Sequence, residues 1–139
     1  EGTDAELAVN SMNVDVLNAT TPTFLDMSET YWSMRDTLTV ETGTLRLPFR
    51  QDVEIVSISA MVATASTGAS IIVDVHKAGT SLYPTSAKPT ISASSFDSGL
   101  SVPDTTFVAA DDYLTVDVDQ IGSTIAGADL SVLIQWRLA

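Results

Sequence analysis

The chain of 139 residues carries 18 acidic and 6 basic side chains, which gives a formal net charge of −12 at pH 7. A charge of this size repels phosphate backbones and anionic lipid headgroups, so it excludes an ordinary binder of nucleic acid or of a membrane surface. The sequence holds no cysteine, which excludes disulfides and thiolate metal sites. Its length predicts one domain, and with 45% hydrophobic residues it can bury one core.

No apolar stretch approaches the roughly 20 residues of a membrane-spanning helix. The first residues also lack a basic segment followed by an apolar one, so no secretory signal is expected.

Residues 1–44 lack a regular pattern of apolar and polar positions. Their apolar content is too high for a disordered tail, so we expect an extended arm that packs either on its own domain or on a neighbouring subunit. Phe24, Tyr31 and Trp32 are candidates for this contact. The remaining residues, 45–139, are predicted to form the folded domain.

From residue 45 onward, apolar and polar residues alternate in short runs that are separated by Gly, Pro, Asp and Ser. This pattern is typical of β-strands joined by turns. The first run predicts one apolar row on a single side of a strand: Val56, Ile58, Ala60 and Val62. The second run predicts an inward row at Ile71, Val73 and Val75, and we expect Asp74 and His76 to face solvent. Gly79 then supplies a turn with positive φ.

Two later runs complete the set of long strands. In the first, Leu114, Val116 and Val118 are predicted to face inward, and Asp117 and Asp119 to face outward. The second predicts a central strand from five alternating residues: Leu130, Val132, Ile134, Trp136 and Leu138. Shorter strands are expected near residues 81–83, 89–91 and 106–108. The sequence therefore predicts an all-β antiparallel sandwich of about eight strands.

Two stretches resemble a module found in structural proteins of tailed phages. The first is GASIIVDVHKAGTS at residues 68–81, followed by KPTI at 88–91. The second, DYLTVDVDQIGST at residues 112–124 followed by GADL at 127–130, is similar to the closing strands of that module. The resemblance covers about residues 45–138. It departs from the family at Asp111, where the family usually has a glycine before the acid of a tight turn.

Members of this family are jelly-roll-like β-sandwiches on phage heads or tails, and they are commonly trimers. The resemblance therefore implies a non-enzymatic structural protein on the virion surface, either a capsid decoration (cement) protein or a head-fibre protein. It would stabilise the particle by subunit packing, as a homotrimer in contact with the major capsid protein or other virion proteins. The alternative is a receptor-binding module of a tail or fibre tip, which would bind a host-surface glycan through residues 81–88 and 92–104.

The residue types that carry catalysis are sparse in this sequence. His76 is the only histidine, no Gly-x-Ser-x-Gly motif is present, and no glycines stand at the spacing of a phosphate-binding loop. We therefore predict no catalytic residue and no cofactor.

Calcium is the one metal that the sequence brings into question. Asp111, Asp112, Asp117 and Asp119 lie close together and offer the hard oxygen ligands that calcium prefers. They lack the spacing of an EF-hand loop, so solvated acids are the favoured interpretation and no metal site is predicted.

Arg35, Arg46, Arg50 and Lys77 could form a local basic strip that pairs with an acidic capsid surface or a neighbouring subunit. Alternatively, they balance acids nearby in the sequence. The aromatic pair Tyr31 and Trp32 could stack on a sugar, although core or interface packing is favoured. The predicted attachment or subunit-interface residues are Phe24, Tyr31, Trp32, Arg35, Arg46 and Arg50.

Overall fold

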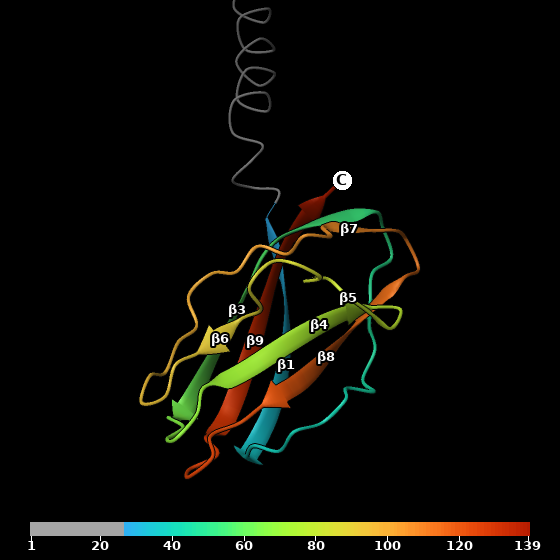
Figure 1. Ribbon diagram of the computed structural model, residues 1–139. Coiled ribbons are helices and arrows are strands. Elements are labelled where there is room, and N and C mark those ends of the chain that lie inside the picture. Colours follow the sequence, from blue (N-terminus) through green and yellow to red (C-terminus); the bar gives the residue numbers. More distant parts are fainter. Residues whose placement is uncertain (1–26) are drawn as a thin grey trace, which may run out of the picture.

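A computed structural model describes residues 27–139 of the chain, which form two antiparallel β-sheets (Figure 1). Sheet A has the order β1 (Ser28–Thr37), β9 (Ala128–Leu138), β3 (Val53–Thr64) and β7 (Phe107–Val108). Sheet B has the order β2 (Leu47–Pro48), β8 (Tyr113–Gln120), β4 (Ile71–Lys77) and β5 (Thr80–Ser81), and β6 (Thr90–Ile91) also pairs with β4. Among the described residues, no helix has the length and apolar character needed to cross a membrane.

The path of the chain between the two sheets is that of a jelly roll. Every connection crosses to the opposite sheet except those that join β4, β5 and β6. Two sheets wound in this way form the double-sheet jelly roll that closes around one core. The predicted all-β antiparallel sandwich is confirmed, and β9 is the predicted central strand because β1 and β3 flank it.

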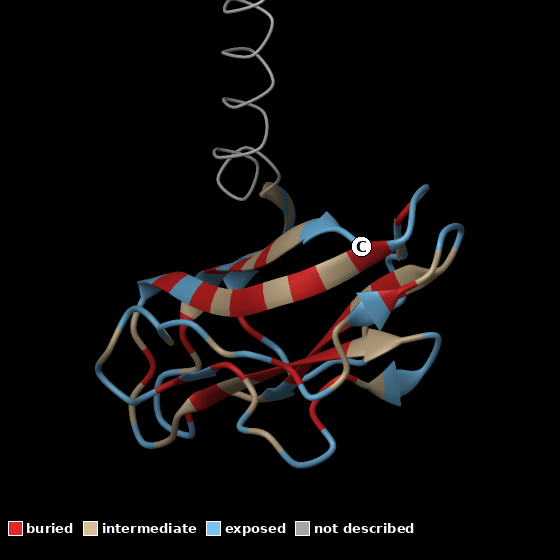
Figure 2. Cartoon of the chain, turned by 90° about the horizontal axis from the view of Figure 1, so that it is seen from above, coloured by how far each residue is buried: buried red, intermediate tan, exposed pale blue. Residues whose placement is uncertain are grey.

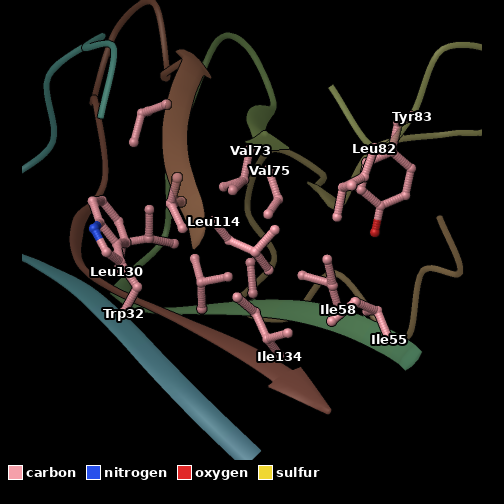
Figure 3. Close-up of a cluster of buried hydrophobic side chains, with 14 of the residues drawn as sticks. Trp32, Ile55, Ile58, Val73, Val75, Leu82, Tyr83, Leu114, Leu130 and Ile134 are labelled. Atoms are coloured by element: carbon pink, nitrogen blue, oxygen red, sulfur yellow. The ribbon is translucent and has the colours of Figure 1, made fainter. Parts of the chain in front are cut away.

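The core lies between the sheets, where the inward rows of both meet (Figure 3). The rows predicted for β4 and β8 are confirmed, since Val73, Val75 and Leu114 are among the fully buried residues. Bands of buried and more exposed residues alternate along the strands, as the period of two requires (Figure 2). The row on β9 holds as far as Ile134, whereas Leu138 is 54% exposed because it stands at the end of the strand.

The row predicted for β3 is wrong at Val56, because the strand contains a β-bulge there. Ile55 pairs with Trp136 and Ser57 pairs with Gln135, so Val56 is an extra residue without an opposite partner. The side that faces inward changes at this point. Val56 is only half-buried and does not share a row with Ile58, because alternation is counted anew after a bulge.

Residues 28–38, which the sequence assigned to the arm, are part of the sandwich. The β1 strand pairs with β9 over its whole length, and Trp32 and Leu38 are buried in the core. Of the two alternatives for the arm, this part packs on its own domain. Residues 1–26, and Phe24 with them, lie outside the described residues, and a domain division at residue 44 stays a prediction.

Two turns have the left-handed backbone that the sequence brought into question. Gly79 has φ 89°, as expected for the β4–β5 turn. Asp111 has φ 68°, so it adopts the conformation for which the resembling family uses glycine. Its amide donates to the Phe49 carbonyl over 2.7 Å, and this bond holds the turn before β8 against the segment that follows β2.

Candidate functional site

On the outer face of β4 and β8, four charged or titratable side chains of these strands and one lysine of the loop before β6 contact one another. We call this set the β4–β8 cluster; its members are Asp74, His76, Lys88, Asp117 and Asp119. Asp74 and Asp117 stand directly opposite each other in the β4–β8 ladder. Two carboxylates in this relation repel each other, so the cations and donors around them decide whether the face is stable.

Asp74 is buried, and the expectation that it faces solvent is wrong. It is only 2% exposed. One oxygen, Oδ1, accepts from the Ser81 hydroxyl at 2.7 Å, and Oδ2 contacts Lys88 Nζ at 2.9 Å. The reason is the chain reversal after β4, because β5 returns along the same strand and residues from the following loop cover the carboxylate.

Hydrogen bonds to Asp74 outweigh the effect of its burial. Burial alone would raise the pKa of the Asp74 carboxyl, but the bonds from Lys88 and Ser81 and the nearby positive charge hold it below its usual value of 3.8. Lys88 shows the converse effect. Its bonds to Asp119 and Asp74 raise its pKa above the usual 10.5. Asp74 and Lys88 therefore form a charged pair at neutral pH.

His76 lies between the two opposing carboxylates and is partly exposed. Nε2 is 3.1 Å from Asp74 Oδ2, and Nδ1 is 3.2 Å from Asp117 Oδ2. The Nε2 contact with Asp74 has the geometry of a hydrogen bond, whereas the Nδ1 contact with Asp117 lies within ion-pair distance only. The two ring nitrogens thus face carboxylates on β4 and β8. His76 therefore links the outer faces of β4 and β8 through these two contacts.

Asp117 also fastens the edge of sheet B. Its Oδ1 accepts from the Gly43 amide at 2.8 Å, in the segment that leads into β2. A side chain on Gly43 would overlap the Val116 carbonyl oxygen, because a Cβ there would stand 1.9 Å from it. Residues 41–46, which we call the edge segment, therefore lie directly on the backbone of β8, with Glu41 bridged to Val118.

A pocket of about 500 Å³ opens between the edge segment and the β4–β8 cluster. The Arg46 guanidinium lies over the Tyr113 ring at its rim, with its carbon 4.4 Å from the ring centroid. His76 and Asp117 form part of the wall. The remaining lining residues are small or hydroxylated: Thr42, Gly43, Thr44, Gly79 and Thr115.

Of the predicted attachment residues, those within 27–139 lie on β1, in the edge segment and after β2. Tyr31 is 64% exposed on β1, whereas its neighbour Trp32 points into the core. Arg35 lines a shallow pocket with Asp129 on sheet A, and Arg50 pairs with Asp111 at 3.0 Å. Lys77 donates to the Phe107 carbonyl. The basic residues are therefore dispersed over different elements, and they do not line up as a strip.

The four aspartates considered for calcium have separate partners. Asp111 pairs with Arg50, Asp119 pairs with Lys88, and Asp117 contacts Gly43 and His76. The Asp112 carboxylate accepts from the Tyr113 amide. Among residues 27–139, no group of three or more acidic or histidine side chains is arranged to hold a metal ion. The four carboxylates do not converge on a common point.

Asp104 joins the two loops that the sequence offered as a receptor contact. Its carboxylate accepts from the backbone amides and hydroxyls of Thr85 and Ser86. These bonds, those from Ser86 first, hold the pKa of Asp104 far below its usual range. The loops at 81–88 and 92–104 are thus attached to each other.

An apolar segment lies along the free side of β3. Residues 96–107 run antiparallel to β3 as an irregular edge, with hydrogen bonds from Val62 to Phe96 and between Ile58 and Ser101. Four large apolar side chains of this segment are exposed: Phe96, Leu100, Val102 and Phe107. Leu100 is 74% exposed. We call these residues the apolar edge.

Comparison with known proteins gives similarity in structure only. No family model matches the chain, and no curated protein matches it in sequence. A chain of the cyanophage Pam1 capsid asymmetric unit aligns with 81% of this chain and 84% of its own length, at 16% identity and a TM-score of 0.47. A chain from Bacillus endospore appendages, described as disulfide-linked pili, aligns with 81% of this chain and 88% of its own, at 14% identity and a TM-score of 0.35.

Sequence reasoning missed the β4–β8 cluster as a unit, although its signal was present. Asp74 and His76 fall on one face of a strand by alternation, and Asp117 and Asp119 do so on another. The fact that these two strands are neighbours, with Asp74 opposite Asp117, comes from the topology.

Proposed function

We propose that this protein is a non-enzymatic structural component of a virus particle, a decoration or cement protein or a head-fibre protein, that stabilises the particle by subunit packing. The apolar edge carries the proposal. Exposed apolar side chains gathered on one segment favour burial against another protein. The jelly-roll sandwich and the sequence resemblance to phage structural proteins point in the same direction.

The apolar edge is proposed as the contact between copies in a homotrimer. If so, the mass in sedimentation experiments at micromolar concentration equals three chains, and Leu100→Asp lowers it towards one. Ile125→Asp is the matched control, because Ile125 is also exposed but belongs to the loop between β8 and β9. A mass of one chain for the unaltered protein at every concentration contradicts the trimer.

Residues 1–26 are proposed as the attachment arm, with the major capsid protein or another virion protein as the partner. A chain shortened to residues 27–139 retains every described strand, so it should unfold at the same denaturant concentration as the full chain. It should also fail to bind purified particles. Equal binding of both chains contradicts a role of the arm in attachment.

The location on the virion is tested by immunogold labelling of intact particles. Label over the head lattice supports decoration, and absence of label from particles contradicts the virion role. Label restricted to tail or fibre tips supports the alternative function, a receptor- or glycan-binding module. The observation in favour of that alternative is the Asp104 junction, since it fixes the two loops in one arrangement.

A further inference from the structure

Arg46 is an unusual cation in a protein with three times as many acids as bases. Among the described residues, no carboxylate lies within ion-pair distance of Arg46. By contrast, Arg50, which follows β2, pairs with Asp111. Arg46 is exposed at the rim of the pocket beside the edge segment. Its donors are therefore available to a ligand.

The guanidinium of Arg46 is held in position before any ligand arrives. It stacks on Tyr113, whose backbone pairs with Pro48 in the β2–β8 ladder. The edge segment on which Arg46 lies is itself fixed by the bond from Gly43 to Asp117. A stacked guanidinium loses less conformational freedom on binding than a mobile one, so its planar fork is ready for an anion.

The remainder of the pocket offers hydroxyl groups. Thr42 and Thr44 come from the edge segment, and Thr115 comes from β8. A hydroxyl both donates and accepts, which suits a ligand that carries hydroxyls of its own. The volume of about 500 Å³ falls within the range of roughly 300 to 1,000 Å³ that is usual for small-molecule sites.

The charge of the surroundings limits what the pocket accepts. Asp117 in the wall and the net charge of −12 oppose a dianion, while a single carboxylate matches the guanidinium of Arg46 at the pocket in bidentate geometry. A neutral sugar could accept hydrogen bonds from that guanidinium, but it would leave the positive charge without a partner. We propose that the pocket binds an acidic sugar unit of the hexuronate class, with its carboxylate on Arg46 and its hydroxyls on the threonines. This binding does not depend on the virion role.

The test uses the isolated full-length protein and titrates it with galacturonate and glucuronate oligosaccharides by calorimetry, with the corresponding neutral oligosaccharides in parallel. We expect the acidic sugars to bind and the neutral ones to bind at least about tenfold more weakly, because a charged hydrogen-bond pair is lost. Arg46→Gln should weaken the binding of the acidic sugars by a similar factor. Arg50→Gln is the matched control and should leave it unchanged.

Two further variants separate the contributions of the guanidinium fork and of a threonine hydroxyl. Arg46→Lys keeps the charge but loses the fork, so it should bind more weakly than the unaltered protein and more tightly than Arg46→Gln. Thr115→Val should weaken acidic sugars without changing their preference over neutral ones. Equal binding of acidic and neutral sugars, tighter binding of a sugar phosphate, or no binding of any hexuronate at millimolar concentration would overturn the proposal.

Discussion

Both faces of the β4–β8 strand pair hold buried side chains, but the chemistry of these side chains differs. On the inner face, Val75 and Leu114 are 0% exposed and contact only the apolar core. On the outer face, the carboxyl-bearing residues Asp74 and Asp117 are 2% and 6% exposed. The inner face depends on volume and shape, whereas the outer face depends on the presence of every hydrogen-bond and charge partner.

The inner face should show the largest single effect. Leu114→Ala removes a fully buried side chain and leaves a cavity, so we expect a loss of about 3 kcal/mol in the free energy of unfolding. Urea unfolding at neutral pH measures it. Leu45→Ala is the matched control, because Leu45 is 61% exposed, and it should change stability by less than about 0.5 kcal/mol. Equal losses for the two variants would contradict the assignment of the core.

On the outer face, removal of one charge should leave another unpaired. Lys88→Met takes the ammonium away from Asp74 and Asp119, and we expect a loss of about 2 kcal/mol because Asp74 stays buried. Adding Asp74→Asn should restore part of that loss, which a double-mutant cycle detects as coupling.

Lys77→Met is the control for the loss of a lysine from the same region. Lys77 contacts only a carbonyl oxygen among the described residues, so its variant should stay within about 0.5 kcal/mol of the unaltered protein. A Lys88→Met variant as stable as Lys77→Met would show that the outer face does not depend on this pairing.

Of the two faces of the β4–β8 strand pair, only the outer one should contribute stability that depends on pH. The pKa of Asp74 is lowered in the folded state, so its stabilisation is present above the usual value of 3.8 and is lost as pH falls below it. The difference in stability between the unaltered protein and Asp74→Asn should therefore shrink between pH 6 and about pH 2. The difference between the unaltered protein and Leu114→Ala should stay constant over that range. A constant Asp74→Asn difference would contradict the pairing.

At alkaline pH, the stabilisation by Lys88 changes with pH in the opposite direction to that by Asp74. The pKa of Lys88 is raised by Asp119 and Asp74, so its stabilisation is present below the usual value of 10.5 and is lost as pH rises through the higher folded value. The loss in Lys88→Met relative to the unaltered protein should thus diminish above about pH 11. Unfolding curves at several alkaline pH values measure this trend.

The inner face could be predicted from the sequence because it depends on a local property. Alternation alone places Val73 and Val116 inward, and no knowledge of neighbouring strands is needed. The outer face could not be predicted because its burial depends on long-range placement. The Asp74 side chain is covered only because β5 returns beside β4, and Lys88 reaches it from beyond that turn.

The same limit explains two other differences. The β1 strand was missed because its inward row begins with Ser28 and Thr30, which carry no apolar signal; the partner that satisfies Thr30 is the indole of Trp136, far away in sequence. Val56 was misplaced because nothing in the alternation marks an extra residue in β3. The pocket beside the edge segment likewise needed the contact of Gly43 with β8, which no local pattern reveals.

The smallest expected effect concerns Asp111, in the turn that leads into β8 and so positions both of its faces. Asp111→Gly removes the exposed pair with Arg50 but relieves the strain at φ 68°, so its stability should lie within about 0.5 kcal/mol of the unaltered protein. Asp111→Val loses the same ion pair and adds a β-branched side chain in the left-handed region, which should cost about 1 to 2 kcal/mol more than the glycine variant. Because the two variants differ only in what the backbone tolerates, equal stability would mean that this turn does not hold the left-handed conformation in solution.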